Sequence, residues 1–435
     1  MAPSKNSILK SLKFGDVVEI NFSKRDFHGD FIRFDDDRRL IIIKLKSGYD
    51  VAIPEKEAAK ISLIQKATLE KKKETVTKET LPFANPDLTI ITTGGTISSK
   101  IDYKTGGVSP SVPPEYYFQI APGLKNYGNI EINSVMRIFS EDMKPSDWVK
   151  IAKAVYAAIK KGSKGVIVTT GTDTMHFASA ALSFMLNPLS VPVVFTGSQR
   201  STDRGSSDAS TNLLLSAITA SKWNGGESVI CMHATLNDDY NFIIRGNRTR
   251  KMHSERRDAF RPINSIPLAR VYLDGKIEDL SDHFERGKET VLNTKIDDKV
   301  KLLISYPGMT GEIIKDAIKS GAHGIVIAGT GFGNLPLKEK SVYEALKYAD
   351  KEGVPIVMTS QTIYGATNQF VYSTLRELSG FENIIYVGNM LIETAFVKLM
   401  FVLGQTKKMA EIRNMMCTPL AGEINDKDNI NEFLI

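Results

Sequence analysis

Cysteine is scarce in this chain of 435 residues, which contains Cys231 and Cys417 and no CxxC pattern. Disulfide scaffolds and structural zinc sites need clustered cysteines, so neither is expected to hold this fold together. The six histidines show no ligand spacing, and packing is the simpler interpretation for His176, His233 and His253. We therefore predict that the chain has no metal site and works in a reducing compartment.

Long apolar runs are also missing. The sequence has no signal-peptide core and no apolar segment long enough to cross a bilayer. These absences predict a cytoplasmic protein without a membrane partner. The net charge of +6 is small, so it is compatible with an RNA-containing assembly without indicating one.

Nucleotide-binding fingerprints are missing as well. GTGFGN and TGSQRSTDRGSS are rich in glycine, but GxGxxG does not follow the first strand and GxxxxGK[ST] does not occur. Neither the Rossmann nor the P-loop pattern is met, which argues against ATP binding or redox chemistry. We predict no cofactor in this chain.

The sequence does contain enough apolar residues, 42%, to bury a large core in two or three domains. Within residues 1–65, the runs GDVVEINF, GDFIRF, RRLIIIKL and YDVAIP are short and strand-like, with the spacing of a small barrel. This pattern predicts an SH3-like or Sm-like β-barrel. Residues 66–86 are rich in Lys, Glu and Thr, which is typical of a solvated linker.

From residue 87, apolar strands alternate with amphipathic helices, as in GVIVTT before HFASAALSFML. This alternation is typical of βαβ units and predicts an α/β fold with a parallel sheet. A polar stretch at 276–298 separates it from a second α/β run, which contains KLLISYPG and ends in the helical segment LIETAFVKLMFVLG. We predict a larger lobe at 87–275 with the active site, and a smaller lobe with a helical C-terminus at 299–435.

A glycine turn ends the first apolar strand of the larger lobe, in ITTGGTISSK at 91–100. Gly94 and Gly95 permit a sharp turn that aims Thr96 into a crevice. The carboxyl ends of parallel strands are where open α/β sheets bind ligands. By itself, however, such a turn is more often structural or phosphate-binding.

A second hydroxyl-bearing turn follows in VTTGTDTMHF at 168–177. Gly171 makes the turn, Thr172 and Asp173 supply polar groups, and a helix is expected to begin near Met175. A hydroxyl beside a carboxylate can position a reacting group, although Asp173 could instead be a helix N-cap.

Lys251 is the third element, in the basic segment RGNRTRKMHSERRDAF. A lysine can act as a general base when neighbouring cations and desolvation lower its pKa, and Arg248, Arg250 and Arg256 are close in sequence. The simpler interpretation is a solvated basic segment. A non-catalytic RNA-binding scaffold is a further alternative, although the segment lacks interleaved aromatic residues for base stacking.

Several ordered motifs carry a resemblance over residues 86–420: TGGTIS, YKTGG, FSEDM, TTGTDTMHF, TGSQRSTDRGSSD, RTRKMHS and GTGFGN. The chain resembles the type I asparaginase family, and more closely its tRNA-linked branch in the archaeal glutamyl-tRNA(Gln) amidotransferases. The resemblance implies a two-lobed α/β fold with active sites at a subunit interface. It therefore implies a homodimer core.

The resemblance also implies roles for individual residues. Thr96 is the candidate nucleophile, and Tyr103 belongs to a mobile loop that assists when the lid closes. The other catalytic candidates are Thr172, Asp173 and Lys251. From the residues alone either threonine could attack; Thr96 is favoured because its turn precedes the expected lid with Tyr103, Gly106 and Gly107.

The expected substrate-binding residues are Ser140, Glu141, Gly95, Gly171 and Asn334. Ser140 and Glu141 fall where the family holds the α-carboxylate and α-ammonium of the substrate; many asparaginases have Gln in place of Glu141. Asn334 matches a position that can reach a neighbouring site, and its alternative role is that of a turn residue.

The resemblance implies a glutaminase subunit that releases ammonia from glutamine, with asparagine as a second candidate donor. A partner subunit of the E type would bind tRNA(Gln), use ATP and Mg²⁺, and convert Glu-tRNA(Gln) to Gln-tRNA(Gln) within a heterotetramer. A free cytoplasmic asparaginase is the nearest alternative. The N-terminal barrel and linker argue against it, because minimal asparaginases do not need them.

Overall fold

The computed structural model describes residues 8–9, 11–13, 15–22, 25–45, 50–66, 83–101, 108–110, 116–202, 206–426 and 430–432. The predicted lid residues Tyr103, Gly106 and Gly107 lie outside the described residues, as does most of the predicted linker.

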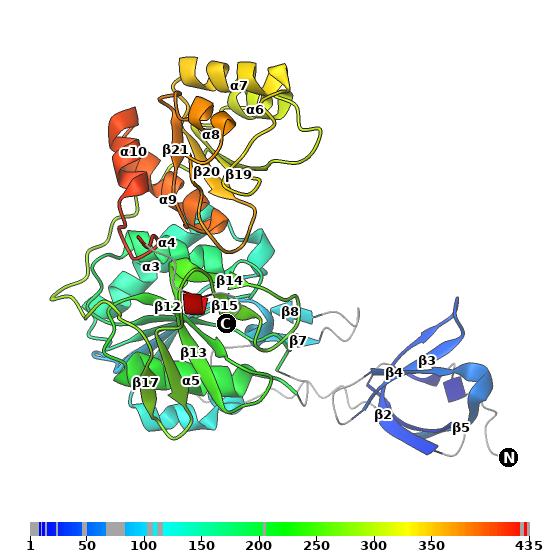
Figure 1. The fold of residues 1–435 in the computed structure, drawn as a ribbon. Coiled ribbons are helices and arrows are strands. Elements are labelled where there is room, and N and C mark those ends of the chain that lie inside the picture. The colour runs from blue at the N-terminus through cyan, green and yellow to red at the C-terminus, as the bar shows by residue number, and fades with distance from the viewer. Residues whose placement is uncertain are drawn as a thin grey trace.

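The N-terminal unit is an antiparallel five-stranded sheet in the order β4-β3-β2-β1-β5, curled around its own core (Figure 1). Its elements are β1 (Val17–Phe22), β2 (Arg25–Asp35), β3 (Leu40–Leu45), β4 (Asp50–Pro54), η1 (Glu55–Glu57) and β5 (Ala58–Gln65). The predicted small β domain is confirmed. Strand β5 was not predicted, because its two buried residues, Ala58 and Ile61, are three apart rather than two.

The larger lobe is built on an eight-stranded sheet in the order β17-β16-β13-β12-β11-β10-β6-β9. Its strands are β6 (Leu88–Gly94), β9 (Ile130–Ile138), β10 (Val166–Thr169), β11 (Val193–Thr196), β12 (Ser228–His233), β13 (Tyr240–Arg245), β16 (Ala269–Tyr272) and β17 (Ile277–Asp279). Its helices are α2 (Tyr116–Ile120), α3 (Pro145–Lys160), α4 (Met175–Met185) and α5 (Ala209–Lys222).

Both faces of this sheet are covered, which is why its central strands are continuously apolar. Ile91 and Val168 face the core beneath α3 and α4, whereas Ile90 and Ile167 face the core beneath α5. The predicted parallel sheet is correct for β9, β6, β10, β11 and β12. The other three strands are antiparallel, so the sheet is mixed. A strand that is buried on both faces has no alternation of apolar and polar residues, so its sequence does not indicate whether it runs parallel or antiparallel to its neighbours.

Short elements surround the sheet. Two hairpins pair β7 (Ser99–Ile101) with β8 (Val108–Pro110) and β14 (Thr249–Lys251) with β15 (Phe260–Pro262). The 3₁₀ turns are η2 (Thr96–Ser98), η3 (Pro122–Tyr127), η4 (Ser140–Asp142), η5 (Gly246–Arg248) and η6 (Ile430–Glu432).

The smaller lobe is a parallel four-stranded sheet in the order β18-β19-β20-β21. Its elements are β18 (Val300–Ile304), α6 (Glu312–Lys319), β19 (Gly324–Gly329), α7 (Lys340–Lys351), β20 (Ile356–Ser360), α8 (Ser373–Leu378), β21 (Ile384–Tyr386), α9 (Ile392–Gln405) and α10 (Met409–Cys417). Helices α6, α7 and α8 cover one face, and α9 covers the face toward the larger lobe (Figure 1).

The two lobes share one hydrophobic core. Helix α9 packs against α4, and two aromatic pairs join them: Phe184 stacks on Phe401 and Phe177 meets Phe396 edge to face. Such pairs add to the free energy gained from burying their apolar area. The smaller lobe is therefore seated on the helical layer of the larger lobe rather than tethered beside it.

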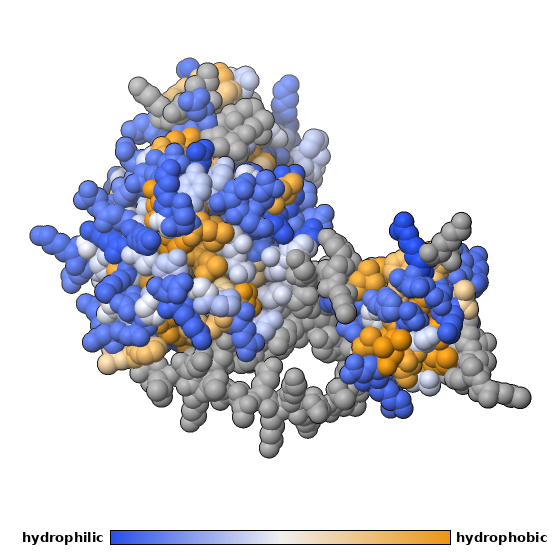
Figure 2. All heavy atoms as spheres, turned by 90° about the horizontal axis from the view of Figure 1, so that it is seen from below, coloured by the Kyte–Doolittle hydropathy of each residue, from blue (hydrophilic) through white to orange (hydrophobic). Residues whose placement is uncertain are grey.

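Hydrophilic side chains cover much of the described surface seen in Figure 2, and apolar side chains gather in smaller areas between them. None of the helices in the described part of the chain is long and apolar enough to cross a membrane.

Asp297 lies in the segment between the lobes and holds that segment to the smaller lobe. Its carboxylate accepts hydrogen bonds from His323 Nδ1 at 2.7 Å, from the backbone N–H of Lys299 at 3.1 Å, and from Lys407. Burial alone would raise the pKa of Asp297, but these donors outweigh it and lower the pKa to about 2.

We predict that Asp297→Asn lowers the free energy of unfolding by about 2 kcal/mol at neutral pH, the value typical of hydrogen bonds to a charged group. In the unfolded chain an aspartate has a pKa of about 3.9, so the wild-type advantage is present above about pH 4. It should shrink as the pH falls toward 2. Denaturant unfolding of both proteins at several pH values measures the difference, and a pH-independent gap would contradict the assignment.

Candidate active site

Turns at the ends of four neighbouring parallel strands form one edge of the larger sheet. The strands are β9, β6, β10 and β11, and their turns contain Ser140, Thr96, Thr172 and Gln199. The ends of β6 and β10 are level, because Thr92 pairs with Thr169, and Thr93 Oγ1 donates to the carbonyl of Thr169 at 3.1 Å. The structure therefore brings the two threonine turns together at this edge.

Gly95 and Gly171 let the two threonine turns touch through their backbones. Gly94 and Gly95 both have positive φ, +107° and +76°, which confirms the sharp turn. A Cβ atom on Gly95 would lie 2.2 Å from the backbone nitrogen of Gly171. Any side chain at residue 95 would therefore separate the turns that carry Thr96 and Thr172.

Ser140 packs on the other side of Gly171. A Cβ atom on Gly171 would lie 2.7 Å from Ser140 Oγ, and Thr174 Oγ1 donates to the carbonyl of Ser140 at 2.6 Å. Ser140 is buried, whereas its neighbour Glu141 is exposed on η4. The structure thus brings Ser140 into the threonine edge and leaves the carboxylate of Glu141 accessible from solvent.

Lys251 joins the second threonine turn by two hydrogen bonds. Its Nζ atom donates to Thr172 Oγ1 at 2.8 Å and to Asp173 Oδ1 at 2.6 Å. Thr172 is 6% exposed and the side chain of Lys251 is 9% exposed, but that of Asp173 is 66% exposed. An amine, a hydroxyl and a carboxylate therefore meet at the border between the core and solvent.

The helix-cap alternative for Asp173 does not describe the structure. Helix α4 begins at Met175 as predicted, and its N-cap residue is Thr174. Asp173 instead forms the ion pair with Lys251. Its carboxylate is placed to orient the lysine amine.

The smaller lobe holds the segment that carries Lys251. The fully buried guanidinium of Arg248 donates to the carbonyl and to Oδ1 of Asn389, both at 3.2 Å, and to the carbonyl of Gly422. Arg250 pairs with Glu393 at 3.3 Å. The position of Lys251 is thus set by residues that lie far away in sequence.

The other arginines of the basic segment also have carboxylate partners. Arg245 pairs with Glu227, Arg257 with Asp238, and both Arg256 and Arg261 with Asp258. The hydrogen bond from Arg256 lowers the pKa of Asp258. Because these cations are paired or buried, the segment is a structural network, and the interpretation as an RNA-binding scaffold loses its main support.

His176 lies behind the site, near the charges of Arg250, Lys251 and Asp173. Burial, helped by the charges of Arg250 and Lys251 and opposed by Asp173, lowers the pKa of His176 to about 3. The imidazole is therefore neutral at physiological pH and serves as packing, as the sequence suggested.

Buried polar atoms without a partner gather at the same edge. Among the described residues they include Thr170 Oγ1, His176 Nδ1, Ser198 Oγ, Gln199 Nε2 and Ser201 Oγ. Buried polar groups are normally hydrogen-bonded, so a local group of exceptions indicates a place for a bound molecule or water. The candidate site therefore extends from the threonine turns to the turn after β11.

Gln199 is the residue of this edge that sequence reasoning missed. It lies in TGSQR, a motif that carries the resemblance but predicted no role for the glutamine. Thr172 Oγ1 donates to Gln199 Oε1 at 3.4 Å. The available signal was a third glycine turn after an apolar strand, PVVFTG.

Asn334 lies in the smaller lobe, in the turn that follows β19. Its Nδ2 atom donates to the carbonyl of Thr330 at 3.1 Å, and their backbones form a bridge. Within this chain Asn334 is thus a turn residue, and a role toward a neighbouring subunit remains a prediction. Tyr103 lies outside the described residues.

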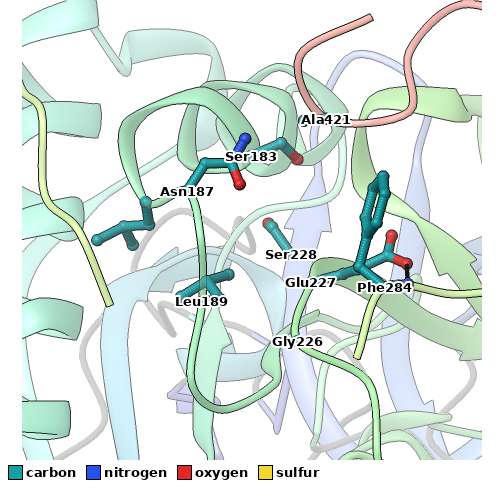
Figure 3. Close-up of a pocket in the computed structure, with 9 residues that line it drawn as sticks. Ser183, Asn187, Leu189, Gly226, Glu227, Ser228, Phe284 and Ala421 are labelled. Carbon is teal, nitrogen blue, oxygen red and sulfur yellow. Dashed lines mark hydrogen bonds between the residues drawn. The ribbon is translucent and has the colours of Figure 1, made fainter. Parts of the chain in front are cut away.

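A separate small cavity of about 20 Å³ lies between the end of α4 and the start of β12 (Figure 3). Its polar groups already have partners: Glu227 accepts from the backbone N–H of Phe284 at 2.7 Å, and Asn187 Nδ2 donates to the carbonyl of Leu420 at 2.7 Å. None of the threonine-edge residues lines it, so we assign the chemistry to the threonine edge.

The fold and the site together define an amidohydrolase of the asparaginase class. Residues 87–283 match the family described as Asparaginase, N-terminal, and residues 299–416 match the Glutaminase/Asparaginase C-terminal domain. Among solved structures, the thermostable L-asparaginase from Thermococcus kodakarensis is similar, with a TM-score of 0.70 and 29% identity. The match covers 78% of this chain and 99% of that one.

Curated relatives match nearly the whole chain. The glutamyl-tRNA(Gln) amidotransferase D subunit of Sulfolobus acidocaldarius is 41% identical over 419 residues, covering 95% of this chain and 92% of the relative. The D subunit of Pyrococcus abyssi is 44% identical over 399 residues, covering 91% and 89%. The chain belongs to the family of glutamyl-tRNA(Gln) amidotransferase D subunits, within the asparaginases.

We predict that Gly95→Ala abolishes amide hydrolysis, because its Cβ would overlap the backbone of Gly171 and push the threonine turns apart. Gly353→Ala is the matched control: Gly353 also has positive φ, +67°, but nothing lies within 4 Å of the added Cβ. That variant should lose about 1 kcal/mol of stability from backbone strain and keep its activity. Ammonia release and thermal unfolding of both variants test this, and an active Gly95→Ala enzyme would refute it.

Proposed function

We propose that this chain is the glutaminase subunit of a tRNA-dependent amidotransferase. It hydrolyses glutamine to glutamate and ammonia, and asparagine is a second candidate donor. The observation that carries the proposal is the pair of hydrogen bonds from Lys251 Nζ to Thr172 Oγ1 and Asp173 Oδ1. They join a hydroxyl, an amine and an orienting carboxylate at the edge where Thr96 also lies.

These groups suit the hydrolysis of a carboxamide. A threonine hydroxyl attacks the amide carbon and gives its proton to deprotonated Lys251, while donors at the turns stabilise the oxyanion. The carbon–nitrogen bond then breaks, the proton returns to nitrogen, and ammonia leaves. Water hydrolyses the resulting ester and regenerates the threonine. We assign the attack to Thr96: its proton passes to the Thr172 hydroxyl as the Thr172 proton passes to Lys251, and Tyr103 assists on the lid.

The substrate amino acid has candidate partners on the neighbouring turns. We propose that Ser140 receives the α-carboxylate, that Glu141 receives the α-ammonium, and that Gly95 and Gly171 line the pocket. The exposed carboxylate of Glu141 supports its role, because it can pair with a cation arriving from solvent. In the proposed homodimer, Asn334 of the neighbouring subunit completes the site.

The ammonia is used by a second subunit. We propose a partner of the E type that binds tRNA(Gln), uses ATP and Mg²⁺ to activate the glutamyl ester, and accepts the ammonia in the cytoplasm. The relatives' name supports this assembly, which we propose is a heterotetramer around the homodimer. This chain itself needs no cofactor for the proposed hydrolysis.

The extent of the similarity favours this function over a free asparaginase. The solved asparaginase accounts for 78% of this chain, whereas the D subunit of Sulfolobus acidocaldarius accounts for 95%. The N-terminal sheet lies outside both asparaginase-family matches, which begin at residue 87, and a minimal asparaginase does not need it.

We predict that Thr96→Ala, Thr172→Ala, Asp173→Ala and Lys251→Ala each abolish glutamine hydrolysis without unfolding the chain. Each substitution removes a group proposed to act in the transition state, so the losses should also be non-additive. Ammonia release is the measurement, and circular dichroism checks the fold. A variant that keeps nearly wild-type activity would remove its residue from the catalytic set.

A second prediction separates ammonia production from its use. In the assembled complex, Thr172→Ala should fail to form Gln-tRNA(Gln) with glutamine as donor, yet support amidation when free ammonium is supplied. Only the donor half-reaction depends on the threonine edge. If the complex were assembled and both donors failed, the division of labour between the subunits would be wrong.

A further inference from the structure

Gln199 is the second hydrogen-bond partner of the Thr172 hydroxyl. Lys251 Nζ donates to Thr172 Oγ1 at 2.8 Å, and Thr172 Oγ1 donates in turn to Gln199 Oε1 at 3.4 Å. A hydroxyl has a single proton. While that proton points to Gln199, it cannot pass to Lys251.

The backbone of Gln199 is firmly held. The fully buried carboxylate of Asp208 accepts hydrogen bonds from the backbone N–H groups of Gln199 and Arg200, each at 3.1 Å. Asn212 Nδ2 donates to the same carboxylate at 3.0 Å. These bonds fix the backbone at residue 199, so any movement of Gln199 is confined to its side chain.

The side-chain amide is held much less firmly. Gln199 Nε2 is buried and has no hydrogen-bond partner among the described residues. Turning the amide by half a turn would exchange Oε1 and Nε2. The exchange would break only the long bond from Thr172 and replace it with a bond from Nε2 to Thr172 Oγ1.

The direction of this bond decides where the Thr172 proton lies. With Oε1 toward Thr172, the hydroxyl donates to Gln199 and accepts from the lysine ammonium. With Nε2 toward Thr172, the hydroxyl accepts from Gln199 and its own proton is free to point to Lys251. The second arrangement is the one that proton transfer to a deprotonated lysine requires.

We propose that Gln199 is a positioning residue for amide hydrolysis, whose side-chain amide turns over to direct the Thr172 proton toward Lys251. The residue acts through Thr172 and needs no contact with the reacting carbon. This inference rests on the proposed hydrolysis of an amide donor, and it holds for glutamine and asparagine alike.

The test uses the full chain and compares Gln199→Glu with Gln199→Met. A glutamate carboxylate can only accept, so it should hold the Thr172 proton and lower kcat by about 100-fold near neutral pH, with KM within about 3-fold. Methionine has a similar size and neither accepts nor donates strongly, so kcat should fall by about 10-fold. Gln405→Glu, at the end of α9, is the matched control and should retain wild-type kcat.

The pH dependence of kcat distinguishes a positioning role of Gln199 from a packing role. Among the described residues, charged groups bonded to the Thr172 hydroxyl, to Lys251 or to the backbone of Gln199 include Lys251, Asp173 and Asp208, and they are common to all the variants. A protonated glutamate side chain in Gln199→Glu could donate as the amide does, so the ratio of its kcat to the wild-type kcat should rise as the pH is lowered. The ratio for Gln199→Met should stay constant.

Three results would overturn the proposal. They are wild-type kcat in Gln199→Glu, equal and pH-independent losses in both variants, and a loss confined to KM, which would mean direct substrate contact. Thermal unfolding checks that both variants fold. If Gln199→Glu does not fold, kcat and KM of Gln199→Met provide the test.

The wild-type chain is first assayed with glutamine and asparagine separately. Activity with asparagine alone would refute the proposed function, and the Gln199 comparison would then be made with asparagine.

Discussion

The contact between the backbones of Gly95 and Gly171 is the constraint on which the site depends. Strands β6 and β10 are neighbours in level register, so their turns leave the sheet at the same height. They can touch only because neither glycine has a Cβ atom: one on Gly95 would lie 2.2 Å from Gly171, and one on Gly171 would lie 2.7 Å from Ser140 Oγ. The turns that carry Thr96 and Thr172 are thereby fixed by backbone packing, and the Ser140 side chain packs against Gly171 from the third turn.

Lys251 reaches this edge from a different part of the fold. Lys251 ends the short strand β14, which pairs only with β15 within the described structure. A two-stranded hairpin has little stability of its own, so its position must come from its surroundings. Arg248, through Asn389 and Gly422, and Arg250, through Glu393, supply that support from the smaller lobe. The packing between the lobes therefore also sets the position of Lys251.

The sequence predicted the parts of the site that follow from local rules. Glycine turns after apolar strands placed Thr96 and Thr172 at one edge, and the helix after Asp173 begins where it was expected. Relations across long sequence distances could not be predicted. Arg248 and Asn389 are 141 residues apart, so the buried arginine looked like part of a solvated basic segment. Gln199 was missed as well: the glycine turn at the end of PVVFTG marks the place, but the contact of Gln199 with a hydroxyl 27 residues away leaves no local pattern.

The pairing of the arginines also constrains how hydrolysis could be controlled. Arg256 and Arg261 both bind Asp258, and Arg245 binds Glu227, so these guanidinium groups are already held by carboxylates and are not free to bind a distant phosphate. A partner that shifts the smaller lobe would act on Lys251 directly, because Arg248 links that lobe to the hairpin through hydrogen bonds of fixed geometry. A partner that controls hydrolysis by shifting the smaller lobe needs only contacts that the fold already contains. A partner that acts through its charge would first have to break these ion pairs.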